Sequence, residues 1–133
     1  MASACRNAHI SEIPSLPTDL VGAEWKPVRH HFGIRAFGAN AYVARAAGEQ
    51  VIEEHSEGSA GHEELYFVTS GGAAFIVGGE EIDAPAGTFV FVGDPAVVRG
   101  AVAKEPGTAV LAVGAPAGAP FALRDWERKR IGG

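Results

Sequence analysis

The chain has 133 residues, of which 47% are hydrophobic and 20% are charged, and its formal net charge at pH 7 is −5. This composition is typical of one globular domain with its own core. The negative net charge argues against non-specific nucleic-acid binding, which depends on clustered Lys and Arg. No apolar run approaches the roughly 20 residues of a membrane helix. We therefore expect neither a nucleic acid nor a membrane as a partner.

Cys5 is the only cysteine, which excludes a disulfide framework and favours a reducing compartment. The first 14 residues, MASACRNAHISEIP, contain no apolar run of the kind found in a signal peptide. We therefore expect a cytoplasmic protein.

Residues 1–22 contain prolines and a glycine without periodicity, and they predict a lead-in segment with a short edge strand over residues 9–13. Residues 23–133 predict a single domain of short apolar runs separated by Gly, Pro and Asp turns. The predicted strands cover residues 25–32, 40–45, 51–55, 65–69, 73–77, 81–84, 88–92, 97–103 and 108–113. Such spacing, with almost no helical pattern, indicates an all-β sandwich or barrel.

The chain ends in a stretch with a different pattern. Residues 121–130 predict one short C-terminal helix after a Pro/Gly/Ala loop. We expect this helix to pack Phe121 and Trp126 against the outside of the barrel.

Residues 48–71, GEQVIEEHSEGSAGHEELYFVTSG, form a glycine-bounded block between two strand-like runs. The block concentrates His55, Glu57, His62 and Glu64, which are the side-chain types that build metal sites and polar ligand sites. No histidine follows His62 in the chain. The second half of any site must therefore come from other residue types.

The two-residue alternation of a strand orders the side chains at the end of this block. His62, Glu64 and Tyr66 fall on one face, so we expect the three to face the interior of the barrel together. Glu63 then faces outward. The adjacent histidines at residues 30–31 would point to opposite faces of a strand, so at most one of them could join a site.

The block resembles the first conserved motif of the cupins, which runs from a glycine through His-x-His to a glutamate and a second glycine. Six residues separate Glu64 from Gly71, as in that motif. His55-x-Glu57 stands where the family has His-x-His, and the stretch from Glu57 to Glu64 is longer than usual. The second cupin motif resembles residues 87–100, GTFVFVGDPAVVRG. Its ligand histidine corresponds there to a valine, or one position along to an arginine.

The resemblance implies a small single-domain cupin, which is a double-stranded jelly-roll barrel with a cavity open at one end. It also implies a homodimer formed through N-terminal strands, for which residues 25–32 are suited. We expect the apolar lining of the cavity to come from alternate residues among Phe75, Val77, Phe89, Val90, Phe91 and Val92.

The resemblance leaves two interpretations of the site open. A usual cupin site holds a divalent ion with three histidines and one glutamate, and here His55, Glu57, Glu64 and His62 would hold Fe, Zn, Mn or Ni. If Arg99 faces inward, it brings a permanent positive charge to the place of that ion. It would then pair with a glutamate or bind the carboxylate or phosphate of a ligand. We prefer the interpretation without a metal.

Three functions follow from these alternatives. The first is a cupin-fold protein that binds a small, anionic organic ligand in the barrel. The second is a metal-dependent enzyme of the dioxygenase, isomerase or cyclase type, and the third is a non-catalytic sensor or accessory domain. The sequence identifies no catalytic residue. The expected ligand-binding residues are His55, Glu57, His62, Glu64, Tyr66 and Arg99.

Overall fold

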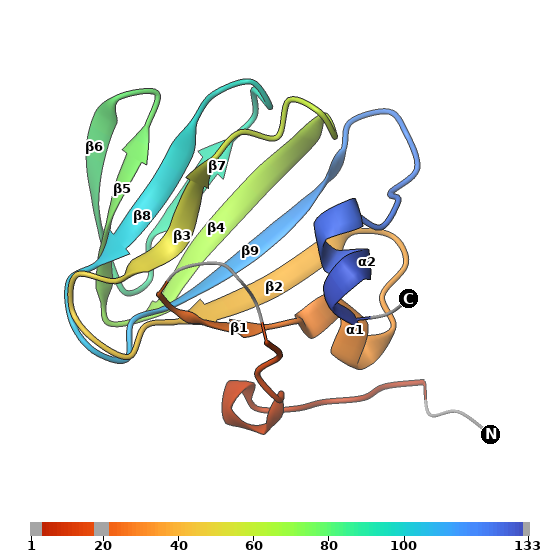
Figure 1. Ribbon diagram of the computed structural model, residues 1–133, viewed down its shortest axis with the longest axis horizontal. Helices are drawn as coiled ribbons and strands as arrows, with labels where there is room; N and C mark the ends of the chain where they lie inside the picture. The colour runs from red at the N-terminus through yellow and green to blue at the C-terminus, as the bar shows by residue number, and fades with distance from the viewer. Residues whose placement is uncertain (1–3, 18–21, 132–133) are drawn as a thin grey trace.

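Two antiparallel β-sheets lie face to face in the computed structural model, which describes residues 4–17 and 22–131 (Figure 1). The first sheet contains, in spatial order, β1 (Glu24–Lys26), β2 (Gly38–Val43), β9 (Ala109–Pro116), β4 (His62–Ser70) and β7 (Phe89–Val92). The second contains β3 (Gln50–His55), β8 (Arg99–Ala103), β5 (Gly72–Val77) and β6 (Glu80–Pro85). This arrangement confirms the predicted jelly-roll barrel, and the predicted strands between residues 40 and 113 all form.

The core lies between the two sheets. Phe75, Val90 and Val92 are buried there, with 0%, 6% and 3% of their surfaces exposed. The alternation along β7 places Phe89 and Phe91 outside, where they are 64% and 62% exposed. The prediction that Phe75, Val77 and the residues of β7 line the cavity is therefore wrong, because they either pack in the core or face outward.

Two segments near the N-terminus are helical where strands were predicted. Residues Ile10–Glu12 form the 3-10 helix η1, and β1 stops at Lys26 because Pro27 cannot donate a ladder hydrogen bond. The helix α1 (Val28–Phe32) follows, and it ends at Gly33, whose φ of 70° is the left-handed conformation that favours glycine. The two histidines of α1 are both exposed and remain outside the cavity.

Gly71 joins β4 to β5 where the two sheets meet. Its φ is 70°, and a Cβ atom at this position would lie 2.4 Å from Oγ1 and 2.7 Å from Cα of Thr108. Thr108 is fully buried, and its hydroxyl donates to the carbonyl of Gly72 at 3.1 Å. Only glycine meets both the conformational and the steric requirement of this corner.

The C-terminal helix α2 (Asp125–Ile131) lies beside α1, near the ends of β2 and β9 (Figure 1). The ring of Trp126 packs 5.2 Å from the ring of Trp25, which is fully buried. Glu127 is 2% exposed and accepts a hydrogen bond from Arg29 Nε of α1 at 2.7 Å. The helix was predicted, but its position was not: Trp126 and Phe121 line a cavity instead of packing outside the barrel.

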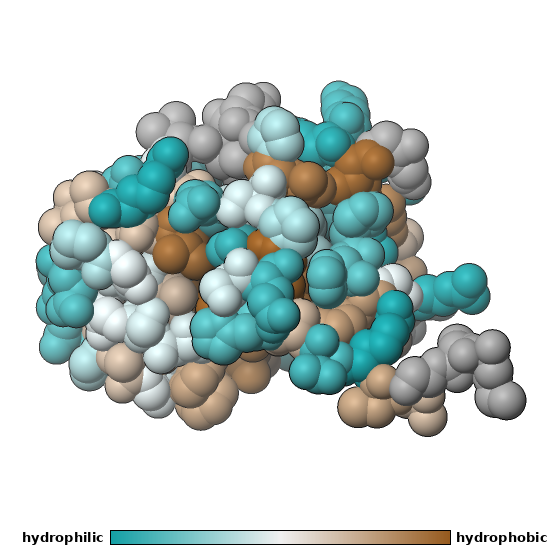
Figure 2. Space-filling model, turned by 90° about the horizontal axis from the view of Figure 1, so that it is seen from below, coloured by the Kyte–Doolittle hydropathy of each residue, from teal (hydrophilic) through white to brown (hydrophobic). Residues whose placement is uncertain are grey.

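The lead-in segment contacts the first sheet in the part that the structure describes. The amide of Leu16 donates to the carbonyl of Trp25 at 3.1 Å, and Ile13 is 4% exposed. The boundary at residue 22 remains a prediction, and residues 1–3 and 18–21 of the lead-in lie outside the described residues. Hydrophilic side chains with apolar patches between them cover the face seen from below (Figure 2). Among the described helices, none has the length and apolar character needed to span a membrane.

Candidate functional site

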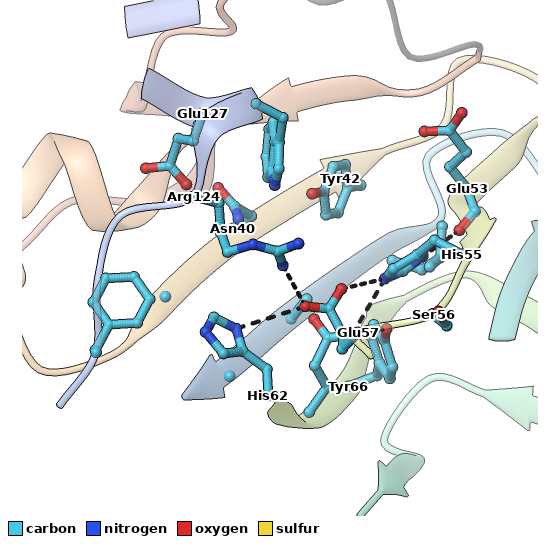
Figure 3. A pocket seen from close by; sticks show the side chains of 17 residues that line it. Asn40, Tyr42, Glu53, His55, Ser56, Glu57, His62, Tyr66, Arg124 and Glu127 are labelled. Carbon is cyan, nitrogen blue, oxygen red and sulfur yellow. Dashed lines mark hydrogen bonds and ion pairs between the residues drawn. The ribbon is translucent and has the colours of Figure 1, made fainter. Parts of the chain in front are cut away.

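A cavity of about 280 Å³ opens at the end of the barrel that α2 covers (Figure 3). Strands β2, β3, β4 and β9 form its walls, and the segment after β9 closes one side. Its aromatic lining comes from Tyr42, Tyr66, Phe121 and Trp126. Its polar lining comes from Asn40, Glu53, His55, Ser56, Glu57, His62, Glu64, Arg124 and Glu127. Five of the six predicted ligand-binding residues thus line one cavity, and Arg99 does not.

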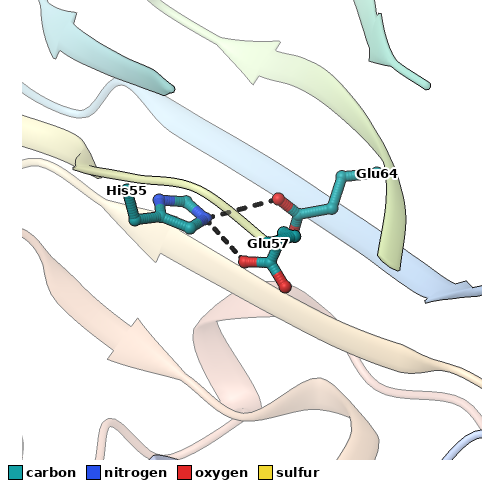
Figure 4. Close-up of side chains that lie close together, drawn as sticks. All are labelled: His55, Glu57 and Glu64. Carbon is teal, nitrogen blue, oxygen red and sulfur yellow. Dashed lines mark ion pairs between the residues drawn. The ribbon is translucent and has the colours of Figure 1, made fainter. Parts of the chain in front are cut away.

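His55 lies at the end of β3 and is held through both ring nitrogens. Its Nδ1 is 2.6 Å from the carbonyl oxygen of Glu53. Its Nε2 is 2.9 Å from Oε2 of Glu57 and 3.4 Å from Oε1 of Glu64 (Figure 4). Burial lowers the pKa of His55, but the hydrogen bonds to both carboxylates and to the backbone outweigh it and raise the pKa to about 10. His55 is therefore an imidazolium at neutral pH.

Glu57 follows β3 in a loop that brings its carboxylate into the cavity, where the residue is 5% exposed. Its backbone amide donates to the carbonyl of Pro95 at 2.8 Å, which fixes the loop. Arg124 Nη1 donates to Oε1 at 2.5 Å, on the opposite side of the carboxylate from His55 (Figure 3). Burial raises the pKa of Glu57, but the hydrogen bond from His55 and the charge of Arg124 lower it below its usual value. Glu57 is thus a carboxylate held between two cations.

Glu64 and Tyr66 project into the cavity from the same face of β4, as the alternation predicted. The hydroxyl of Tyr66 donates to Oε1 of Glu64 at 2.5 Å, and Arg99 Nη1 donates to the same oxygen at 2.9 Å. Burial and the charge of Glu64 raise the pKa of Tyr66 above its usual value. Tyr66 therefore stays a neutral phenol, and Glu64 carries the negative charge that Arg99 balances.

Arg99 is completely buried at the start of β8, directly across the ladder from His55. Besides its bond to Glu64, its Nη2 donates to the carbonyl of Asp94 at 3.3 Å. The predicted ion pair with a glutamate is thus present, and it involves Glu64. The guanidinium lies behind the wall of the cavity, so it acts on the cavity through Glu64.

His62 is also buried, with 6% of its surface exposed, and its Nδ1 is 3.6 Å from Oε1 of Glu57. Its ring centroid is 5.7 Å from that of Phe121. Burial and the charge of Arg124 lower the pKa of His62, although the two nearby glutamates oppose this shift. His62 is therefore a neutral imidazole beside the charged cluster, which consists of His55, Glu57, Glu64, Arg99 and Arg124.

Sequence reasoning missed several residues of the cavity, and Arg124 is the most important. Its side chain is 25% exposed and is the arginine that lines the cavity itself. Asn40 accepts a hydrogen bond from Trp25 Nε1 at 2.8 Å through Oδ1, which leaves its amide group oriented as a donor. Burial and the charge of Glu64 raise the pKa of Tyr42, so its hydroxyl is neutral. None of these residues belongs to a recognisable motif, and only the fold brings them to the cluster.

His55, Glu57 and Glu64 form a group that could hold a metal ion, since one ligand atom from each lies within 4.8 Å of the others. Imidazole and carboxylate donors suit Fe, Mn or Zn. However, an arginine already pairs with each carboxylate, at 2.5 Å for Glu57 and 2.9 Å for Glu64. The donor spacing fits a divalent ion, but the charge balance does not, because the two carboxylates are already neutralised.

No protein-family model matches the chain, and no curated protein matches it in sequence. Solved structures match it in fold. KdgF from Halomonas sp. is 22% identical, with a TM-score of 0.62 over 78% of this chain and 82% of that one. A cupin protein from Bacteroides fragilis is 19% identical, with a TM-score of 0.58 over 87% and 94%. A sugar phosphate isomerase of the cupin superfamily from Silicibacter pomeroyi is 15% identical, with a TM-score of 0.67 over 82% and 74%. The chain therefore has the cupin fold.

Proposed function

We propose that this cupin-fold protein binds a small, anionic organic molecule in the cavity beneath α2, with Arg124 and His55 as the groups that attract the anion. The observation that carries the proposal is the position of Arg124. Its guanidinium lines the cavity, is partly open to solvent, and uses Nη1 for Glu57. A guanidinium has five N–H donors in a planar fork, so it can bind a carboxylate or a phosphate as well.

The charges around the cluster support an anion rather than a cation. Arg99, Arg124 and the imidazolium of His55 face the two carboxylates Glu57 and Glu64, so the positive charges are in excess. The carboxylate of Glu127 is paired with Arg29 outside the cluster, and Glu53 is exposed at the rim.

The lining of the cavity supports an organic ligand. A volume of about 280 Å³ is near the lower end of small-molecule pockets. The rings of Trp126, Phe121 and Tyr42 offer apolar surfaces, and the amide of Asn40 and the hydroxyl of Tyr42 offer hydrogen bonds at set positions. In such a site the charged groups would hold the anionic end of a ligand and the aromatic walls would hold its carbon skeleton.

A binding screen with matched arginine variants tests this proposal. Thermal shift and calorimetry would be run with malonate, succinate, glucuronate and inorganic phosphate as probes, and with glucose as a neutral control. Arg124→Gln should weaken binding of the preferred anion by at least about tenfold, the effect of losing one charged hydrogen bond. Arg128→Gln, in the neighbouring helix α2, should leave the affinity unchanged because Arg128 pairs with Asp125 and does not line the cavity. Equal effects of the two substitutions, or no binding of any anion, would reject the proposal.

A metal-dependent enzyme is the second candidate, and the spacing of His55, Glu57 and Glu64 favours it. A bound divalent ion would supply Lewis-acid chemistry at the floor of the cavity. The solved structures of similar fold include proteins named as enzymes, such as the sugar phosphate isomerase. Metal analysis of the protein as purified and after chelation separates this candidate from the first, since only the second requires a stoichiometric ion.

A further inference from the structure

Arg99 differs from every other charged group at the site because no ligand can reach it. The side chain is completely buried, and a hydrogen bond to Glu64 and another to the carbonyl of Asp94 hold its two terminal nitrogens. Its Nε is the one buried side-chain nitrogen or oxygen without a hydrogen-bond partner in the part of the chain that the structure describes. A buried charge with an unsatisfied donor is unfavourable, so its presence calls for a role beyond packing.

The sheet places this charge directly beside the potential metal ligands. Arg99 and His55 are paired residues on β8 and β3. Arg99 Nη1 donates to Glu64 Oε1, and the same oxygen is 3.4 Å from His55 Nε2. An ion held by His55, Glu57 and Glu64 would therefore lie beside a guanidinium, which does not lose its proton in proteins.

The two arginines of the cluster differ in freedom of movement. Arg124 lies beyond β9 with a side chain that is 25% exposed, so a ligand or an ion could displace it from Glu57. Arg99 belongs to a central strand of its sheet, with ladder partners on β3 and β5, and its side chain is 0% exposed. The strand is too closely packed for Arg99 to move away. Its charge is a permanent part of the site.

We propose that Arg99 is an internal cation that takes the place of a metal for Glu64, and that the residue at this position decides whether the cluster can hold a divalent ion. Arg99 neutralises Glu64, its hydrogen bond orients the carboxylate, and its charge repels an incoming cation. The wild-type cluster therefore binds no divalent ion at stoichiometric level. This inference concerns the cations of the site and does not depend on which anion the cavity binds.

The register of the sheet also indicates how a metal site could be created. In Arg99→His, the new imidazole would stand across the ladder from His55, at the Cβ separation of about 4.5–5.5 Å that is usual for paired residues. The substitution removes the repelling charge and adds a nitrogen donor. The cluster would then offer two histidines and two carboxylates, a donor set that suits Zn²⁺ or Co²⁺.

The test compares wild type, His55→Ala, Arg99→His, Arg99→Lys and the double variant Arg99→His with His55→Ala. Each full-length protein is stripped with chelator, incubated with Zn²⁺ or Co²⁺, and passed through gel filtration. Bound metal is measured by elemental analysis, and Co²⁺ coordination by its visible absorption. We expect no retained metal in wild type or Arg99→Lys, about one ion per chain in Arg99→His, and loss of that ion in the double variant.

Two results would overturn the proposal. One is stoichiometric Zn²⁺ in wild type that is lost in His55→Ala, because Arg99 would then not exclude the ion. The other is a folded Arg99→His variant, shown by circular dichroism, that binds no more metal than wild type. If Arg99→His does not fold, Arg99→Gln removes the charge without adding a nitrogen ligand and should bind Zn²⁺ at least about tenfold more tightly than Arg99→Lys. Equal affinities of those two variants would also overturn it. Anion binding through Arg124 is measured separately, so either proposal can fail alone.

Discussion

The buried pair of Arg99 and Glu64 makes a quantitative prediction about stability. Glu64 is the only carboxylate that pairs with Arg99 among the described residues, and the guanidinium is fully buried while the Glu64 side chain is 14% exposed. Glu64→Gln keeps the shape of the side chain but leaves Arg99 as an uncompensated buried charge. Loss of one partner of a buried pair costs about 3–5 kcal/mol of the free energy of unfolding.

The reverse substitution should cost less. Arg99→Met leaves Glu64 with the hydrogen bond from Tyr66 and the nearby imidazolium of His55, and with some contact with solvent. We expect a loss of about 1–3 kcal/mol, mainly from an unbalanced carboxylate and changed packing. In the double variant, which combines Glu64→Gln with Arg99→Met, no buried charge is left without its partner. Its loss should therefore be smaller than the sum of the single losses by about 2 kcal/mol or more.

Urea unfolding followed by tryptophan fluorescence measures all four proteins of this cycle. The effects are large compared with a typical total stability of about 5–15 kcal/mol, so the curves should separate clearly. The exposed pair of Lys104 and Asp83 is the matched control, and its coupling should be about 1 kcal/mol or less. If the Arg99 and Glu64 effects add to within about 0.5 kcal/mol, the two side chains do not interact as the structure requires, and the reasoning fails.

Three further predictions concern the corner of the barrel, the histidine and the C-terminal helix. Gly71→Ala should cost about 2 kcal/mol or more in unfolding free energy, because the new methyl group would lie 2.7 Å from Cα of Thr108. Gly107→Ala is the control: its φ is 79° and no atom lies within 4 Å of the new methyl group, so it should cost only about 1 kcal/mol. Equal losses would contradict the steric argument. The raised pKa of His55, about 10 against 6.5, means that its imidazolium stabilises the fold fully below pH 6.5 and that this stability disappears as pH rises through 10. The difference in unfolding free energy between wild type and His55→Gln should thus shrink over that window, and a difference that grows with pH would refute the assignment. Glu127→Gln should speed amide hydrogen exchange in α2 because it breaks the ion pair with Arg29 of α1. Arg128→Gln should leave the exchange unchanged, because Arg128 pairs with Asp125 within α2. Unchanged exchange in both variants would show that the pair of Arg29 and Glu127 does not hold the helix.

Much of the candidate site could be predicted because it comes from one short stretch of chain. The alternation of β4 places Glu64 and Tyr66 on one face, whichever way the barrel closes. His55 ends the preceding strand, and Glu57 follows it in a loop. Such local relations need no knowledge of tertiary packing, so the residue types and their order were sufficient.

Two parts of the site could not be predicted, for different reasons. The orientation of Arg99 remained open because an arginine among small apolar residues suits either a strand edge or a buried position. The pairing of β8 with β3 resolves this by placing Arg99 across from His55. Arg124 had no signal at all, since its role arises only where residues 121–127 return across the mouth of the barrel to a carboxylate 67 positions earlier.

The sequence alone determined the class of fold, the strand segments between residues 40 and 113 and the carboxylate and histidine cluster, because strand alternation and glycine turns are local properties of the chain. The tertiary structure alone decided which charges meet. Ion pairing depends on distances of a few ångströms between segments far apart in the chain, and such distances exist only after the sheets pair and α2 covers the cavity. For this reason the histidine and glutamates of residues 48–71 could be identified as a candidate site from the sequence. Only the fold revealed that two arginines balance them.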